Sequence, residues 1–432
     1  MTLRKILPLG LILLLAACSQ SAERPLSSYA PPPDVEVHFT VLVPQGTPDE
    51  DIQLSIVDAV TGIAFNPRRY TMQPAGENGY AVSISVPFGS LLTYRYVRQG
   101  DATTFETAAT GAAISYRELL VNRTNMSSND LVAAWSDLPS QVVAGQISGQ
   151  VTDAESGAPI GGLNVSASGL HTTTDAEGIY ILGGLIQGQH NLVISSPDGA
   201  YVSFQQAALV AEDMDTPAHI QMHRAEMLSV TFSLALPEDS VPSVPIYLVG
   251  NLAQLGSGAS SPAELPRLQP GAEGRYTLTL LLPAGVDIRY KYTLGDGFWN
   301  AEHLPSGAFA LRQLVLGGDA AGLTVEDQVS QWTAGASAPI WFQVTPPAGT
   351  EGPVYLQFKL LDWTASIPMW TLGDGRWAYK LYSPTNFGTP LEYRYCLDGA
   401  CATPEVDAAR TVTGNQENTQ VLEDQVSGWQ GQ

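Results

Sequence analysis

Three stretches of this chain resemble one another, and that repetition constrains its fold more than any other feature. They end alike, as NDLVAAW, EDQVSQW and EDQVSGW, with closing tryptophans Trp135, Trp332 and Trp429. Each also contains two tyrosines separated by one residue, in TYRYVRQGD from Thr93, RYKYTLGDG from Arg289 and EYRYCLDGA from Glu392. A repeat of about 100 residues can build its own hydrophobic core. We therefore expect a row of small, similar domains.

The residue pattern within each repeat favours β-strands. Each repeat opens with alternating apolar and polar residues, as VEVHFTVLVP from Val35, LSVTFSLALP from Leu228 and IWFQVTPP from Ile340. Glycine supplies 41 residues and proline 30, which mark frequent turns, and charged residues make up only 14% of the chain. No window shows a sustained helical period. The sequence predicts an all-β protein, built as a tandem array of β-sandwich domains.

The segment between the first and second repeats has a different pattern. Short strand-like runs alternate there with SG, GG, DAEG and PDG turns. The order of GxVxD, SGxPI, TTTDxxGxY and GLxxGxxxLxI resembles the carboxypeptidase-regulatory-like domain over residues 146–223. The resemblance implies a small transthyretin-like β-sandwich that acts as a non-catalytic spacer.

The second repeat carries a likeness to a sugar-binding family. Its motifs, in chain order, are PIYLVGNLAQLG, GRYTLTLLLPAG, DIRYKYTLGDGFWNAE and LRQLVL. They resemble the family-20 carbohydrate-binding module, a starch-binding domain, which implies an immunoglobulin-like antiparallel sandwich for the three repeats. The resemblance also implies non-catalytic binding of α-glucan or a related oligosaccharide. An exposed aromatic ring can stack on the C–H face of such a neutral sugar.

The resemblance implies sugar-binding residues at particular positions of the second repeat. Lys291 and Trp299 stand where the family has a lysine and a tryptophan, and we expect Trp299 in a loop that faces the ligand. Asn300 and Glu302 are the polar residues that follow, and Glu302 is expected to accept a sugar hydroxyl. Leu311 replaces the family's asparagine, so the predicted site is incomplete.

The other two repeats carry parts of the same pattern. In the first repeat Phe105 stands at the tryptophan position, and the third repeat has Trp363 and Trp370 near aromatic positions of the family. For Trp363 and Trp370 a place in the core is the open alternative. We expect the three closing tryptophans and Trp377 in the core, together with one tyrosine of each pair.

A second function stays open, that of a structural or adhesive surface protein whose sandwich modules have lost the sugar site. The family's lysine is replaced by Arg95 in the first repeat and by Arg394 in the third. Together with Leu311, these substitutions favour the structural alternative.

The charge balance excludes one class of partner. The chain has 20 basic and 42 acidic residues, a formal net charge of −22, whereas a nucleic-acid surface needs clustered lysine and arginine. No GxSxG or HExxH motif and no Cys/His pair indicates a catalytic nucleophile. We predict a non-enzyme with no nucleic-acid partner, no catalytic residue, no cofactor and no metal site.

The N-terminus predicts export and a lipid anchor. Residues 1–17 contain Arg4, Lys5 and the apolar run LPLGLILLLAA, typical of a signal peptide. The run ends in LAAC at Cys18, which resembles the lipobox of bacterial lipoproteins and implies that Cys18 is lipidated. Residues 18–34 are rich in serine and proline and predict an extended tether. We expect a protein anchored in the cell envelope and facing outside the cytoplasm.

The domain boundaries follow from the repeats. They are 35–138, 228–332 and 340–429 for the starch-binding-like modules and 146–223 for the regulatory-like domain. In the last module Cys396 and Cys401 flank the turn LDGA. A hairpin brings such a pair within the roughly 4.4–6.8 Å Cα separation that a disulfide needs, and export supplies an oxidising compartment. We predict a disulfide between them.

Overall fold

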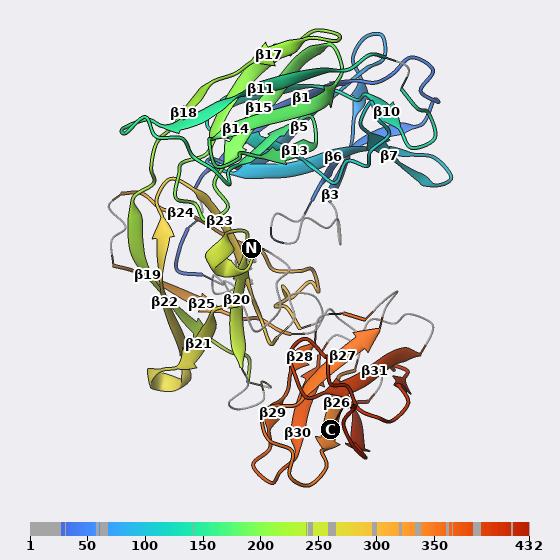
Figure 1. Ribbon diagram of the computed structural model, residues 1–432, viewed down its shortest axis with the longest axis vertical. Coiled ribbons are helices and arrows are strands. Elements are labelled where there is room, and N and C mark those ends of the chain that lie inside the picture. The colour runs from blue at the N-terminus through green and yellow to red at the C-terminus, as the bar shows by residue number, and fades with distance from the viewer. Residues whose placement is uncertain are drawn as a thin grey trace, which may run out of the picture.

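The computed structural model confirms the all-β class predicted from the sequence. It describes residues 27–30, 32–57, 60, 68–140, 142–238, 240, 245–257, 265–295, 300–318, 322–332, 338–359, 363–364, 366–382, 390–415 and 418–431. We name the predicted ranges module 1 (35–138), the regulatory-like module (146–223), module 2 (228–332) and module 3 (340–429). Module 1 lies beside the regulatory-like module at one end, module 3 forms the other end, and module 2 lies between them (Figure 1). None of the helices among the described residues has the length and apolar character needed to cross a bilayer.

Module 1 is a sandwich of two sheets. The first has the order β4 (Gln73–Pro74), β5 (Gly79–Pro87), β1 (Asp34–Leu42) and β9 (Asn125–Leu131). The second has the order β10 (Ala134–Trp135), β7 (Thr103–Thr107), β6 (Leu91–Gln99), β2 (Asp51–Ile56) and β3 (Arg68–Thr71), with β8 (Arg117–Leu120) on β6. Because side chains alternate along a strand, Val37, Phe39 and Val41 of β1 all point into the core.

Module 3 repeats this plan. Its first sheet has the order β29 (Trp370–Thr371), β30 (Trp377–Leu381), β26 (Ile340–Thr345) and β33 (Gln420–Gln425). Its second has the order β28 (Ile367–Pro368), β27 (Tyr355–Lys359), β31 (Leu391–Cys396) and β32 (Arg410–Val412). In both modules the first strand pairs antiparallel with a middle strand and parallel with the last strand of its own sheet.

Module 2 joins its two layers through a shared strand. The path runs β24 (Arg312–Val315), β23 (Asp287–Thr293), β20 (Ile246–Gly250), β21 (Arg267–Pro270), β22 (Tyr276–Pro283), β19 (Met227–Ala235) and β25 (Leu323–Gln328). The shared strand is β21, which pairs with both β20 and β22. Short 3-10 turns, η1 (Ala253–Leu255) and η3 (Ala272–Gly274), lie in its loops.

The regulatory-like module is a smaller sandwich of two sheets. One contains β14 (Ile179–Leu185), β11 (Gly145–Asp153), β17 (Asp215–Pro217) and β18 (Ile220–Met222). The other has the order β13 (Leu170–Thr173), β12 (Asn164–Ala167), β15 (Gly188–Ser195) and β16 (Phe204–Val210).

The closing tryptophans are core residues, as predicted. Trp135, Trp332 and Trp429 are each at most 4% exposed. Each indole N–H donates to a hydroxyl oxygen near the start of its own module, at 3.0 Å to Thr47, 3.0 Å to Ser240 and 3.1 Å to Thr350. Because a buried indole N–H needs an acceptor, each tryptophan fastens the end of its module to the beginning.

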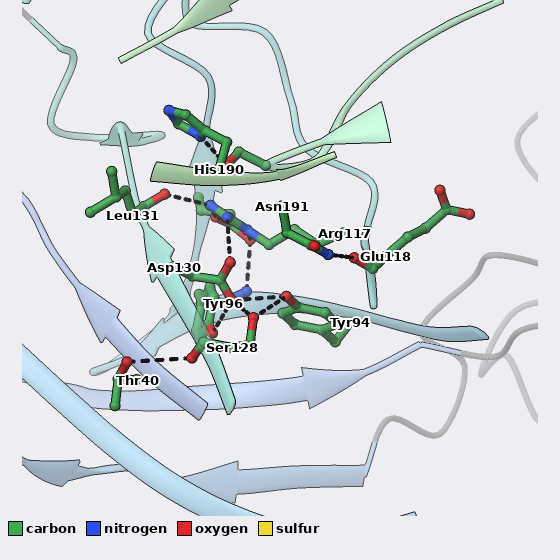
Figure 2. Close-up of polar contacts among 12 residues, drawn as sticks. Thr40, Tyr94, Tyr96, Arg117, Glu118, Ser128, Asp130, Leu131, His190 and Asn191 are labelled. Carbon is green, nitrogen blue, oxygen red and sulfur yellow. Dashed lines mark hydrogen bonds and ion pairs between the residues drawn. The ribbon is translucent and has the colours of Figure 1, made fainter. Parts of the chain in front are cut away.

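Both tyrosines of each pair are buried, which corrects the expectation that only one is. Residues two apart on a strand point to the same face, so Tyr94 and Tyr96 enter the core together. Both hydroxyls donate to one carboxylate oxygen of Asp130, each at 2.8 Å (Figure 2). The same arrangement recurs at Asp327 for Tyr290 and Tyr292 and at Asp424 for Tyr393 and Tyr395, with distances of 2.7–2.9 Å.

An arginine and a glutamate complete this buried group, which we call the polar cluster. In module 1 Arg117 binds Glu106 at 2.6 Å and lies 3.5 Å from Asp130. Burial alone would lower the pKa of Arg117, but the two carboxylates outweigh it and raise that pKa above its ordinary value. The equivalent residues are Arg312, Glu302 and Asp327 in module 2 and Arg410, Glu405 and Asp424 in module 3.

Polar contacts join module 1 to its neighbours. Its joint with module 2 contains a bond of 2.8 Å from the Leu91 N–H to Asp287, whose neighbour Arg289 donates to Ser90 at 2.8 Å. On the other side, the Leu120 N–H donates to the side chain of Gln205 in the regulatory-like module at 2.7 Å.

The end of the predicted tether lies against module 2. The Ser28 N–H donates to the Glu326 carbonyl at 2.7 Å, and the Tyr29 hydroxyl donates to the Val315 carbonyl at 2.6 Å. Tyr29 also packs against the module 2 core. Residues 28–29 are therefore part of the folded structure and not of an extended tether.

Breaking one polar cluster should destabilise its module strongly. In Arg312→Met, Glu302 and Asp327 stay buried without their cation, and such a loss costs about 3–5 kcal/mol. We expect the free energy of unfolding of module 2 to fall by that amount, measured by hydrogen exchange of the β23 amides in increasing urea.

Arg376→Met is the matched control, because Arg376 and its partner Asp374, 2.7 Å away, are both exposed. That variant should lose less than about 1 kcal/mol. Equal losses in the two variants would show that the cluster contributes no more than a surface ion pair.

Candidate functional site

The residue between the paired tyrosines is basic in every repeat, and it points away from the core. Because neighbours on a strand face opposite sides of the sheet, Arg95, Lys291 and Arg394 lie on the outer faces of their sheets. Each has an aromatic ring beside it, with centroid distances of 4.4 Å to Phe105, 5.6 Å to Phe309 and 4.1 Å to Trp363. The three outer faces thus share a cation and an aromatic ring, the components of a sugar-binding surface.

In module 2 the predicted site is largely closed to ligands. Lys291 is only 2% exposed, so a sugar cannot reach its ammonium group in this structure. Trp299, the residue expected to stack on the ligand, lies outside the described residues.

Glu302 is the first clear correction. It is fully buried in the polar cluster, where its carboxylate binds Arg312 and accepts the Tyr292 N–H at 3.1 Å. These bonds occupy the carboxylate, so Glu302 does not face a sugar hydroxyl.

Asn300 is the second correction. It is fully buried at the joint between modules 2 and 3. Its amide nitrogen donates to the Tyr379 hydroxyl at 2.8 Å and to the Lys380 carbonyl at 2.7 Å, and its oxygen accepts the Tyr382 N–H at 2.9 Å. Tyr382 in turn packs within the core of module 2. Asn300 therefore connects two modules and does not contact a ligand.

A buried histidine beside this region was missed in the sequence. His303 is 1% exposed, and its ring lies 4.6 Å from the Phe309 ring. Burial lowers the pKa of His303 to about 4, and Lys291 adds to this effect, so the ring is neutral at pH 7. A lone histidine in a sequence gives no signal of burial, because its neighbours come from other strands.

In module 1 the predicted residue Phe105 is accessible. Its ring is 37% exposed on β7, and the Arg95 guanidinium lies over it. Nearby, Arg69 and Thr103 both donate to the side-chain oxygen of Gln99, at 3.1 and 2.7 Å. The surface offers one apolar ring among polar groups.

In module 3 the two predicted tryptophans have different surroundings. Trp370 is half-buried, packs against the cores of both module 2 and module 3, and lies 5.5 Å from the Tyr379 ring. The position of Trp370 therefore agrees with the alternative that this residue packs in a core. Trp363 is half-buried on the outer face.

The Trp363 face is the best-formed candidate site. Arg394 lies 4.1 Å from the indole centroid, and Lys359 lies 5.7 Å away. Gln357 accepts a bond from Arg394 at 2.8 Å and donates to the Thr364 carbonyl at 2.6 Å. These bonds hold the guanidinium and the Thr364 carbonyl in place near the ring.

An ion pair borders this face and stays open to solvent. Lys359 and Glu392 are 2.7 Å apart, and both side chains are 41% exposed. Lys359 can donate hydrogen bonds to a neutral ligand and Glu392 can accept them. Within the described part of the chain, no group of three potential metal ligands occurs.

The structure contains the Cys396–Cys401 disulfide, with a Cα separation of 5.1 Å. It closes the loop after β31, where Asp398 accepts the N–H groups of Ala400, Ala402 and Thr403. The loop after β31 is thus fixed by a covalent bond and by backbone hydrogen bonds.

A family comparison confirms one resemblance. Residues 146–223 match the carboxypeptidase regulatory-like domain, the range predicted from the sequence. The matched model is a regulatory-type domain and not a catalytic one.

Two curated proteins share a segment of about one module in length. The amylopullulanase of Thermoanaerobacter thermohydrosulfuricus is 30% identical over 108 residues, which are 24% of this chain and 7% of that protein. The alpha-amylase of Niallia circulans is 37% identical over 106 residues, 24% of this chain and 8% of that protein. The chain therefore spans only a small part of either relative.

The solved structures that this chain matches have low sequence identity and low TM-scores. A streptococcal ancillary pilin is 11% identical, covering 68% of this chain and 99% of its own, with a TM-score of 0.24. A family 26 carbohydrate-binding module of Eubacterium rectale, solved with maltoheptaose, is 14% identical, covering 48% and 94%, with a TM-score of 0.17.

The joint at Asn300 gives a direct prediction. Asn300→Ala removes the hydrogen bond that Asn300 donates to the Lys380 carbonyl and the one that it accepts from the Tyr382 N–H, at a cost of about 1–3 kcal/mol for each buried bond. We expect module 3 to separate from module 2, which would increase the radius of gyration in small-angle X-ray scattering.

Asn125→Ala, an exposed asparagine at the start of β9, is the control and should leave the scattering unchanged. A scattering curve of Asn300→Ala identical to that of the unmodified chain would contradict a connecting role for Asn300.

Proposed function

We propose that this chain is a non-catalytic cell-envelope protein that binds α-glucan or a related oligosaccharide. Its principal contact surface is the Trp363 face of module 3, and the Phe105 face of module 1 is a weaker second surface. In module 2 the proposal keeps Trp299, which lies outside the described residues, as a ligand contact, and it does not include the buried Lys291.

The arrangement at Trp363 carries this proposal. An indole that is half-buried is held firmly by its surroundings and still offers ring surface to a ligand. Arg394, Lys359 and Glu392 supply hydrogen-bonding groups around it. Neutral sugars bind to such surfaces through stacking on the ring and hydrogen bonds at its edge. The segments shared with two starch-degrading enzymes support the same ligand class.

The structural alternative rests on a different observation. Asn300 and Trp370, two residues predicted to bind sugar, instead lie in the joint between modules 2 and 3. A chain of modules fixed to one another in this way suits a spacer or adhesive element. A measurement of whether the full chain binds glucan distinguishes the two functions.

The proposal predicts that Trp363→Ala weakens binding of maltoheptaose at least tenfold, about 1.4 kcal/mol, because the stacking surface is lost. Isothermal titration calorimetry on the full chain measures this change, and circular dichroism checks that the fold is retained.

Trp341→Ala is the matched control, since Trp341 is also half-buried in module 3, with Lys380 5.8 Å from its ring, but lies on the other sheet. It should keep full affinity. No saturable heat from the unmodified chain, or equal loss in the two variants, would favour the structural alternative.

The proposed location depends on Cys18, which lies outside the described residues. If Cys18 is lipidated, Cys18→Ser should move the protein from the membrane fraction to the soluble fraction, because a lipid chain supplies about 0.8 kcal/mol per buried CH₂. Fractionation of expressing cells with detergent partitioning measures it. Ser19→Ala is the neighbouring control and should stay in the membrane fraction; equal partitioning of Cys18→Ser and the unmodified chain would exclude the anchor.

A further inference from the structure

A cavity lies where module 1, the regulatory-like module and module 2 meet. It has a volume of about 260 Å³, is partly open to solvent and is lined by residues from all three modules. Module 1 contributes Tyr116 and Glu118, the regulatory-like module contributes Asn164, Ser195 and Ser203, and module 2 contributes Asp287. The space is large enough for a ligand of several heavy atoms, since one water takes about 30 Å³ of liquid.

Two of the polar side chains converge on the cavity from adjacent strands. Asn164 of β12 and Ser195 of β15 are direct partners in the sheet, so their side chains lie on the same face, with Cβ atoms about 5 Å apart. Ser195 is only 7% exposed. Within the described residues the side chains of Asn164, Ser195 and Ser203 form no hydrogen bond with protein groups, and the Ser195 oxygen keeps a solvent-accessible surface. Their donors and acceptors are therefore available to a bound molecule.

An aromatic ring and a carboxylate are fixed beside these groups. The Tyr116 ring packs 4.6 Å from the His171 ring, and the His171 Nε2 atom lies 3.0 Å from the Tyr116 carbonyl oxygen. Glu118 accepts a bond from the Ser166 hydroxyl. The cavity thus has an apolar ring on one side and a held acceptor near it.

The charges around the cavity select the kind of ligand. No lysine or arginine is among its described lining residues, and two carboxylates are, so an anion is disfavoured. Asp287 is already bound by the Leu91 N–H, Arg289 and Gln313 at 2.7–3.0 Å, which leaves it unavailable to a cation. The kind of ligand that suits these charges is therefore a neutral molecule with hydroxyl groups and a C–H face.

We propose that this cavity is a binding site for a neutral mono- or disaccharide. The Tyr116 ring packs against the sugar, and Asn164, Ser195, Ser203 and Glu118 bond its hydroxyls. The site needs three modules in fixed positions, in contrast to the open Trp363 face, and it does not depend on that face.

Titration of maltose into the full chain carrying Trp363→Ala tests this site separately from the proposed function. We expect a saturable heat with a Kd near about 1 mM. Adding Asn164→Ala, which removes one or two hydrogen bonds at an exposed position, should weaken binding about fivefold. Adding Ser203→Phe instead, which fills the cavity, should abolish it.

Asn125→Ala on the same background is the control and should keep the affinity. The absence of saturable heat up to about 50 mM maltose, or equal affinity with and without Asn164→Ala, would overturn the proposal. If circular dichroism shows that Ser203→Phe does not fold, the comparison of maltose affinity with and without Asn164→Ala still tests the proposal. Loss of maltoheptaose binding in Trp363→Ala with retained maltose binding would separate the two sites.

Discussion

The buried polar cluster is the interaction on which the architecture depends. In each of the three repeats the aspartate comes from the last strand of one sheet, while the tyrosines, and the glutamate and arginine that follow them, belong to the opposite layer. One arginine therefore links the two layers through two carboxylates. Removing these charges from water is costly, and the arrangement is stable because the carboxylates and the guanidinium form several hydrogen bonds and ion pairs with one another, although Arg117 Nη1 and Arg410 Nε donate no hydrogen bond to any described residue. The Glu106 carboxylate even accepts the backbone N–H of Tyr96, and Glu302 and Glu405 repeat this bond at 3.0–3.1 Å.

The cluster also determines where a ligand can bind. Because both tyrosines and the glutamate point inward, the basic residue between the tyrosines must point outward. On this strand of each repeat, only the outer face, at Arg95, Lys291 and Arg394, is therefore available for contact with a ligand. The joints then decide which face stays open, since the surroundings of Lys291 are buried and those of Arg394 include the exposed pair of Lys359 and Glu392. The three equivalent outer faces are therefore open to solvent to different extents for geometric reasons.

The sequence predicted the strands, the core tryptophans and the regulatory-like range, because these follow from local alternation and motif order. Because residues two apart on a strand face the same side of the sheet, the sequence could also have placed both tyrosines of each pair in the core. Glu302 was predictable in principle, since the second tyrosine is followed ten residues later by a glutamate in every repeat, at Glu106, Glu302 and Glu405. Asn300 was not, because its three partners lie in the next module, about 80 residues away, and no pattern within one repeat reports a joint between two.

The joints have a consequence for avidity. Weak sites on one chain gain affinity together only when their spacing matches the ligand, and a rigid chain fixes that spacing. The bond from Leu91 to Asp287, the bond from Leu120 to Gln205 and the three bonds of Asn300 hold the modules in one arrangement. The faces at Phe105 and Trp363 therefore cannot adjust independently to one short oligosaccharide. Under the proposed function they are suited to a polymer long enough to reach both, and a short sugar would occupy only one of these faces at a time.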